Sequence, residues 1–265
     1  LSPDALSLGR FEVSPSAVQE NNRNLRVVAG GGGFMVTWST STSDGQLSHQ
    51  ARRVRTNGTL VDGAPIDLGI LSYRVETSGN ADGFYVVHVR QTGLNKESFS
   101  LTYIKPATES DPALSTFTLG ESTGGYSTFI VRNDLLLYSQ YEDRPGHMYS
   151  QKFFSVRFGP NGALRAIAQI APFQYASLYA LAFDGTQYVV TGYDSGYFAR
   201  YLGADGLTLG ASGPVDSNVI AADADGLTTS SQTLPTQICN YNADFSPKGS
   251  CYLIPPDVFV ARGSV

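Results

Sequence analysis

Ile66-Asp67-Leu68-Gly69 consists of a hydrophobic residue, one spacer residue, leucine and glycine. This four-residue pattern, which we call the leucine-glycine ending because it is typical of the end of a strand, recurs along the chain. Its other copies are Leu6-Ser7-Leu8-Gly9, Phe117-Thr118-Leu119-Gly120, Leu207-Thr208-Leu209-Gly210 and the degenerate Ala168-Gln169-Ile170-Ala171. Successive copies are 60, 51, 51 and 39 residues apart. Such spacing indicates an array of similar modules rather than one irregular domain.

Each module also contains an apolar run, usually preceded by glycine or aspartate. These runs are Gly33–Trp38, Gly83–Val89, Asp134–Tyr138, Gln187–Val190 and the weaker Gly226–Thr229. They are rich in β-branched and aromatic residues and are flanked by turn residues, which is typical of strands. Because they do not alternate between apolar and polar residues, we expect both faces of these strands to be buried. Helical crossovers are missing, so the strands must form antiparallel meanders.

A third element in most modules ends in a tight turn containing Asn-Gly or Asp-Gly, as at Asn57-Gly58, Asn161-Gly162 and Asp205-Gly206. These dipeptides supply the positive φ values of hairpin turns, so we interpret the glycines as structural. With a less regular first strand, each module has four strands. Four-stranded meanders repeated at about 40 to 50 residues are the sequence signature of β-propeller blades.

The pattern GGGFMVTWS at 31–39, followed by ARRVRTNGTLVDGAPIDLG at 51–69, resembles the repeats of secreted bacterial β-propeller proteins. We therefore expect an all-β fold: a single β-propeller domain over 1–265 with five four-stranded blades. The expected blades are 22–69, 70–120, 121–171, 172–210 and 211–254 plus 1–9. In this interpretation the N-terminal strand 1–9 completes the last blade and helps close the ring. The alternative is that 251–254 forms that fourth strand and 1–9 adds an edge strand.

Composition limits the partners. The chain has 265 residues, of which 42% are hydrophobic and only 15% charged, with a net charge of −5. Nucleic acids and anionic membranes attract basic surfaces, so we expect neither as a partner. No apolar run approaches the length of a membrane-spanning helix, and the first residues lack the features of a signal peptide. We interpret the chain as a mature protein or an excised domain.

Cys239 and Cys251 are the two cysteines, and turn-like residues including Ser246-Pro247-Lys248-Gly249 lie between them. If that turn closes a hairpin, the two thiols lie opposite each other within bridging distance. We therefore favour a disulfide, and with it a secreted or cell-surface protein. The alternative is a pair of unbridged cysteines in a cytosolic protein.

The resemblance to propellers also implies where function lies. It places the loops 40–48, 91–98, 140–148, 193–196 and 233–236 on one face, joined by the inter-blade loops near 121–128 and 171–176. The expected ligand-binding residues on this face are Tyr126, Tyr141, Glu142, Asp143, Arg144, His147, Tyr175, Tyr193 and Asp194. Tyrosines combine an apolar ring with a polar hydroxyl, which suits stacking on sugar rings, whereas alternate tyrosines within strands should belong to the core.

Residues 140–147 contain carboxylates, an arginine and a histidine in one segment. Such a set can hydrogen-bond a sugar, bind a cation or supply general acid and base groups. The alternative is a solvated loop without a binding role, in which Arg144 pairs with a neighbouring carboxylate. His49, His88 and His147 fall in three modules, which leaves a three-histidine metal site as an alternative. We expect no metal, no cofactor and no catalytic residue.

The sequence thus favours an extracellular binding module that recognises carbohydrate or a partner protein, leaning away from an enzyme. One alternative is a polysaccharide-active hydrolase or lyase with acidic residues at the ring axis, such as Glu142 and Asp143 with His147. Another is a structural module of a larger adhesin, filament or toxin. The propeller fold hosts both binding proteins and enzymes, so it does not decide between them.

Overall fold

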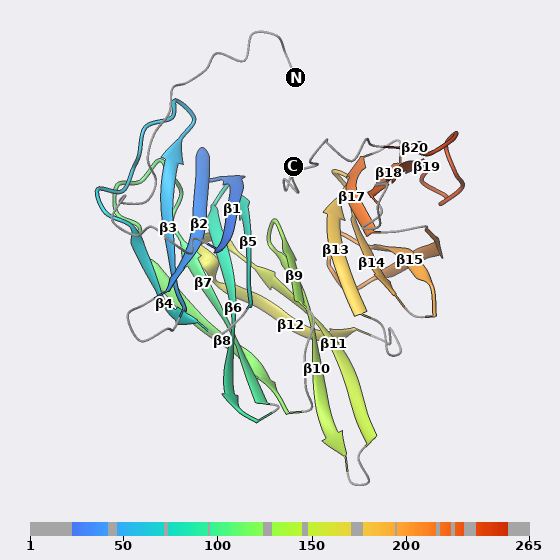
Figure 1. The fold of residues 1–265 in the computed structure, drawn as a ribbon, viewed down its shortest axis with the longest axis horizontal. Helices are drawn as coiled ribbons and strands as arrows, with labels where there is room; N and C mark the ends of the chain where they lie inside the picture. The colour runs from blue at the N-terminus through green and yellow to red at the C-terminus, as the bar shows by residue number, and fades with distance from the viewer. Residues whose placement is uncertain are drawn as a thin grey trace. The chain divides into compact units, whose positions relative to one another are not determined.

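The computed structural model describes residues 23–41, 47–71, 74–94, 96–123, 129–144, 148–170, 177–193, 195–215, 218–223, 226–230 and 237–253. These residues form five four-stranded sheets, and in each sheet the strands follow one another in sequence order (Figure 1). Their only helix is the short 3-10 turn Pro160–Gly162. The chain is therefore an all-β protein, and its five antiparallel sheets form the blades of a five-bladed β-propeller, as the sequence predicts.

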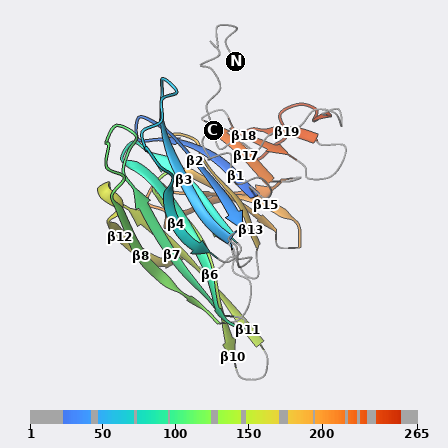
Figure 2. The ribbon, with the colours of Figure 1, turned by 60° about the vertical axis from the view of Figure 1, so that its left-hand side comes forward.

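Most of the first two sheets, together with Pro160–Gly162, belongs to one compact unit. The strands of these sheets are β1 (Arg23–Gly30), β2 (Gly33–Ser41), β3 (Leu47–Arg55), β4 (Ile66–Leu71), β5 (Arg74–Asn80), β6 (Gly83–Gly93), β7 (Lys96–Ile104) and β8 (Leu114–Ser122). Figure 2 shows β6, β7 and β8 side by side within the second sheet. Buried residues of both sheets, among them Met35, Ile66 and Phe84, share one hydrophobic cluster.

The other three sheets belong to a second compact unit. Their strands are β9 (Phe129–Arg132), β10 (Leu135–Arg144), β11 (Met148–Phe158), β12 (Leu164–Ile170), β13 (Ser177–Phe183), β14 (Tyr188–Tyr193), β15 (Tyr197–Leu202), β16 (Leu209–Pro214), β17 (Asn218–Asp223), β18 (Gly226–Ser230), β19 (Gln237–Tyr241) and β20 (Tyr252–Leu253). One hydrophobic cluster joins the third and fourth sheets, and another joins the fourth and fifth. The fourth sheet is thus packed on both faces.

The apolar runs are the second strands of their sheets, and they are buried on both faces. Every residue of β6 from Gly83 to Val89 is buried, as is every residue of β14 from Tyr188 to Gly192. A strand with no alternation between buried and exposed residues must have packed layers on each side. The burial expected from the missing polar alternation is therefore confirmed.

The glycine that precedes three of these runs is required by close backbone packing. A Cβ atom at Gly33, Gly83 or Gly226 would collide with a carbonyl oxygen of the neighbouring third strand. The glycines before the first run have a different function, because Gly31 and Gly32 have φ values of 53° and 71°. Two successive positive φ values are those of a type I′ hairpin turn, which joins β1 to β2.

In the described copies, the leucine or isoleucine of the repeated ending lies in the fourth strand of its sheet and packs into the core, and the copy at 6–9 lies outside the described residues. Leu119 and Ile170 are buried, whereas Leu68 and Leu209 are partly buried against hydrophobic clusters of their own units. The turn glycines Gly58, Gly162 and Gly206 have φ values of 83°, 72° and 73°, which confirms their structural role.

The fifth sheet obtains its fourth strand from the C-terminal segment. In β20, Tyr252 pairs with Ile238 and Leu253 pairs with Gln237 of β19. The alternative in which 251–254 supplies this strand therefore describes the fifth sheet, whereas residues 1–9 lie outside the described part of the chain.

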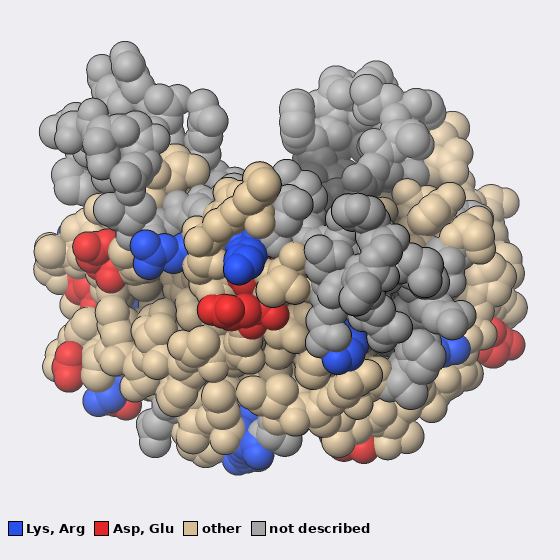
Figure 3. Space-filling model, turned by 90° about the horizontal axis from the view of Figure 1, so that it is seen from below, with Lys and Arg blue, Asp and Glu red and all other residues tan. Residues whose placement is uncertain are grey.

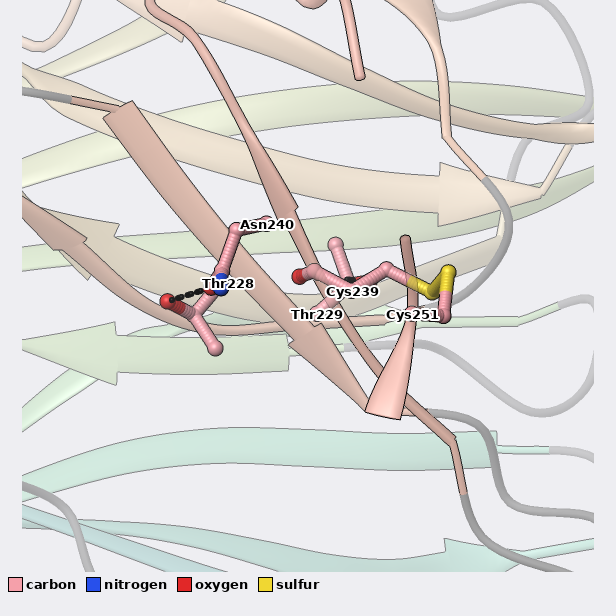
Figure 4. Close-up of a disulfide and its surroundings, with 5 residues drawn as sticks. All are labelled: Thr228, Thr229, Cys239, Asn240 and Cys251. Atoms are coloured by element: carbon pink, nitrogen blue, oxygen red, sulfur yellow. Dashed lines mark hydrogen bonds between the residues drawn. A yellow bond between two sulfur atoms is a disulfide. The ribbon is translucent and has the colours of Figure 1, made fainter. Parts of the chain in front are cut away.

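A disulfide links Cys239 to Cys251 next to this pairing, with their Cα atoms 4.3 Å apart. Figure 4 shows the disulfide between Cys239 of β19 and Cys251, which directly precedes β20, with the Thr228–Asn240 hydrogen bond further along the same sheet. Cys239 is buried in the cluster between the fourth and fifth sheets. The predicted disulfide is confirmed, and it anchors the shortest strand of the fold to its neighbour.

Candidate functional site

Residues Gln140–Arg144 form a strand and not the loop that the sequence suggests. They belong to β10, and their ladder with β11 continues through Glu142↔Ser150 and Asp143↔Tyr149 to Arg144↔Met148. The structure thus gives the backbone positions of Glu142, Asp143 and Arg144 in a long hairpin. His147, which was expected to act with them, lies outside the described residues.

Tyr141, in the same strand, is held at the junction with the end of β8. Its backbone N–H donates to Ser122 Oγ at 3.0 Å, and its carbonyl accepts from the Thr123 N–H at 3.0 Å. Burial raises the pKa of the half-buried Tyr141 phenol, and a hydrogen bond with Gln151 opposes that rise. These backbone contacts hold Tyr141 against the end of β8, within one compact unit, and its role as a ligand residue stays a prediction.

Three exposed tyrosines come together on the fourth sheet, and we call Tyr179, Tyr193 and Tyr197 the tyrosine cluster. Their exposed fractions are 45%, 44% and 37%. The Tyr193 and Tyr197 rings meet edge to face with centroids 5.2 Å apart, and the Tyr179 and Tyr197 centroids are 6.1 Å apart. Three tyrosine rings in contact, each more than a third exposed, form an aromatic surface available to a ligand.

The hairpin between β14 and β15 positions two members of the cluster. Tyr193 and Tyr197 are direct cross-strand partners and form the last pair before the turn. The turn includes Ser195, with a φ of 56°, and the exposed Gly196. Aromatic residues that face each other across an antiparallel pair stabilise the hairpin. The predicted ligand residue Tyr193 thus lies in the cluster, whereas its neighbour Asp194 is outside the described residues.

A bulge in β13 positions the third member. Leu178 pairs with Gly192 and Ala180 with Thr191, so Tyr179 is an extra residue without its own partner. The Ala182 side chain packs toward the fifth sheet. In a regular strand, successive side chains point to opposite faces, so Tyr179, three residues before Ala182, would lie on the face directed away from the fifth sheet. The bulge shifts this alternation by one residue. As a result, Tyr179 lies beside Tyr197, on the face that also carries the buried Ala199 and Tyr201.

The strands around the cluster are almost free of charge. Arg200 is the only charged residue in β13, β14 and β15, and its guanidinium donates to Ser212 Oγ of β16 at 3.3 Å. Figure 3 shows one face of the molecule, where charged side chains form small, separate groups among uncharged atoms. The tyrosine cluster therefore offers ring faces and hydroxyl groups on strands whose single charged residue is Arg200.

Other tyrosines of the same sheets are parts of the core. Tyr138 and Tyr188 are buried, and burial raises the pKa of Tyr138 to about 12. The Tyr188 hydroxyl donates to Asp134 Oδ1 at 2.8 Å and accepts from Arg157 Nη1 at 3.0 Å. Burial, followed by the adjacent Asp134 carboxylate, raises the pKa of Tyr188. The Asp134–Arg157–Tyr188 group therefore connects the third and fourth sheets. The Tyr188 phenol is buried and is not available to a ligand.

The sequence singled out Tyr193 as a ligand residue but not Tyr179 or Tyr197. The signal for Tyr197 is its spacing from Tyr193, because residues flanking a three-residue hairpin turn face each other. Tyr179 has no such signal, since the bulge that exposes it comes from the pairing of β13 with β14. The predicted residues Tyr126 and Tyr175 lie outside the described part of the chain.

The two described histidines are interior residues. His49 lies with Nδ1 3.0 Å from Ser39 Oγ, and His88 has Nε2 3.0 Å from Thr102 Oγ1. Burial lowers the pKa of each to about 4, with the nearby His49 contributing to the shift of His88. Among the described residues no group of three or more His, Cys, Asp or Glu side chains could hold a metal ion. Nor does any helix in this part of the chain have the length and apolar character to cross a membrane.

No protein-family model matches the chain, and no curated protein sequence matches it. Solved structures do match its fold. It is similar to a subtype N11 neuraminidase-like protein of A/flat-faced bat/Peru, with 10% identity over 89% of this chain and 74% of that chain and a TM-score of 0.53. A subtype N10 neuraminidase-like protein of A/little yellow-shouldered bat/Guatemala matches with 10% identity over 88% and 83% of the two chains and a TM-score of 0.51.

A Mycobacterium tuberculosis puromycin-hydrolyzing peptidase also matches, with 15% identity and a TM-score of 0.51. The match covers 86% of this chain but only 38% of the peptidase. At such low identities the similarity concerns the backbone alone, and proteins with unrelated activities share this architecture. The comparisons therefore place the chain among proteins with the β-propeller fold.

Proposed function

We propose that this protein is an extracellular binding module that recognises an uncharged carbohydrate through the tyrosine cluster. The observation that carries the proposal is the contact among three rings that each remain more than a third exposed on the fourth sheet. Buried aromatic residues are ordinary parts of a core, whereas these tyrosines contact one another across a hairpin and still keep more than a third of their surface exposed.

The chemistry of a sugar ring fits this surface. A pyranose has an apolar face of C–H groups and a rim of hydroxyl groups, and tyrosine offers the complementary ring face and phenolic hydroxyl. Because Tyr193 and Tyr197 meet at an interplanar angle of 75°, they present surfaces of different orientation to one ligand. The absence of charge from β13 and β14 favours a neutral ligand over a uronic acid or a sulfated glycan.

The disulfide supports an extracellular location, since such bonds persist in oxidising compartments. We therefore propose secretion or display at a cell surface, with carbohydrate as the partner and a protein partner as the competing possibility. The net charge of −5 supports the proposal that neither nucleic acid nor a membrane is a partner.

The test is isothermal titration calorimetry with neutral trisaccharides of glucose, N-acetylglucosamine, mannose and galactose. We expect at least one trisaccharide to bind, and we expect Tyr193→Ala to weaken its binding at least tenfold. Tyr252→Ala is the matched control, because Tyr252 is 66% exposed but lies on β20 of the fifth sheet. Circular dichroism would verify that both variants are folded.

Failure of all four trisaccharides to bind would overturn the carbohydrate proposal. Equal weakening by Tyr193→Ala and Tyr252→Ala would overturn the assignment of the site. Cleavage of the bound sugar, lost in Glu142→Gln, would instead establish the hydrolase or lyase alternative.

A further inference from the structure

The backbone that presents the tyrosine cluster is repeated in other blades, which allows a position-by-position comparison. A one-residue irregularity equivalent to the bulge at Tyr179 occurs in the first strand of two other sheets. It lies between Arg23 and Arg26 of β1, and between Val219 and Ala221 of β17. The bulge is thus a feature of the module and is not particular to the fourth blade.

The side chains at these repeated positions differ. The irregularities contain Asn24 and Leu25 in the first sheet and Ile220 in the fifth, where the fourth sheet has Tyr179. The last cross-strand pairs before the turn between second and third strands, equivalent to Tyr193↔Tyr197, are Ser41↔Leu47, Arg144↔Met148 and Ser230↔Ile238. In the second sheet β6 ends at Gly93 and β7 begins at Lys96. None of these residues is aromatic.

The turns themselves show the same difference at the level of sequence. In the other blades they read Thr42-Ser43-Asp44-Gly45-Gln46, Leu94-Asn95, Pro145-Gly146-His147 and Ser231-Gln232-Thr233-Leu234-Pro235-Thr236. They contain no tyrosine, tryptophan or phenylalanine. The aromatic pair across this turn therefore occurs in one blade of five.

We infer that each chain has a single ligand site of this kind, on the fourth blade, although the module that supports it is repeated. This inference deepens the proposed function and rests on it. A protein in which every blade carries the aromatic set would bind several sugars and cross-link multivalent glycans. This chain binds one sugar per chain through three tyrosines, because the other blades have the bulge or the hairpin without the rings.

The experiment measures stoichiometry with the trisaccharide that binds in the calorimetric panel. We expect one trisaccharide per chain, by calorimetry and by native mass spectrometry, and complete loss of that binding in the Tyr179→Ala, Tyr193→Ala double variant. The control is Leu25→Ala with Ile238→Ala, which changes the equivalent positions of the first and fifth sheets. We expect it to leave the stoichiometry and affinity unchanged.

The outcomes separate this inference from the proposed function. Two or more trisaccharides per chain, or binding that survives in the double tyrosine variant, would overturn the single site while carbohydrate recognition stands. Loss of half or more of the bound sugar in the Leu25→Ala, Ile238→Ala variant would overturn it as well. No binding by any member of the panel would overturn both.

Discussion

Arg53 and Asp62 form a buried ion pair, with Arg53 Nη2 2.6 Å from Asp62 Oδ1 and side-chain exposures of 0% and 5%. The same guanidinium donates to the carbonyl oxygens of Lys105, Pro106 and Ser110, which follow β7 in the next sheet. A buried charge with this many partners connects the first two blades. Its removal leaves the remaining groups desolvated and unpaired.

We predict that Asp62→Ala lowers the free energy of unfolding by about 3 to 5 kcal/mol, because Arg53 would remain buried without its counter-ion. Urea denaturation measures the effect. The matched control is Glu76→Ala, which breaks the partly exposed Arg26–Glu76 pair. A solvated pair contributes about 1 kcal/mol or less. Similar losses in the two variants would contradict the prediction.

We predict that stability falls in mild acid because of His49 and His88. Their pKa values are lowered from 6.5 to about 4 in the folded protein, so the unfolded chain binds more protons between these values. The stabilisation is therefore complete above pH 6.5 and is lost as the pH falls toward 4. Urea midpoints measured from pH 7.5 to 4.0 test this slope. In His88→Gln the slope should be reduced, and an unchanged slope would contradict the assignment.

We predict that reduction of the Cys239–Cys251 disulfide destabilises the fifth sheet. The bond closes a segment with a sequence separation of 12, and loops of this size are stabilised by about 2 to 4 kcal/mol. Hydrogen exchange should increase in β19 and β20 of the Cys239→Ser, Cys251→Ser double variant. Exchange in β2 and β6 serves as the internal reference. Uniform exchange changes over both sets of strands would contradict a local role.

We predict that Gly226→Ala lowers the free energy of unfolding, although alanine in place of glycine within a strand is ordinarily not destabilising. A Cβ atom there collides with the Tyr241 carbonyl oxygen, and the φ of 144° is unfavourable for a residue with a side chain. Gly63→Ala is the control, because no atom lies within 4 Å of its added Cβ. Thermal melts should show a lowered Tm for the first variant and little change for the second.

The sequence predicted those features that depend on local chemistry. Glycine before an apolar run, Asn-Gly in a turn and two cysteines across a hairpin each reflect a constraint within a few residues. It was wrong about Gln140–Arg144, because the length of a hairpin ladder is set by pairing between β10 and β11 and not by the polarity of the residues. Polar residues at the exposed end of a hairpin are equally compatible with strand and loop.

The candidate site was predictable only in part for the same reason. Tyr193 lies beside a turn, so its exposure could be inferred from its neighbours in sequence. Tyr179 lies within an apolar segment, Ser177–Phe183, where alternation predicts a buried residue or one on the opposite face. Its exposure depends on a pairing shift against Gly192 and Thr191, which no pattern within β13 reveals.

The bulge in the first strand of the fourth sheet has a consequence for how such a protein acquires new specificity. Its geometry is held by main-chain pairing on either side, and the extra residue itself has no cross-strand partner. The position therefore accepts a leucine in one blade and a tyrosine in another within the same backbone. Under the proposed function, we expect exchange of that one side chain to change what the surface recognises while the pairing that supports the blade stays the same, which would separate diversification of ligands from the stability of the fold.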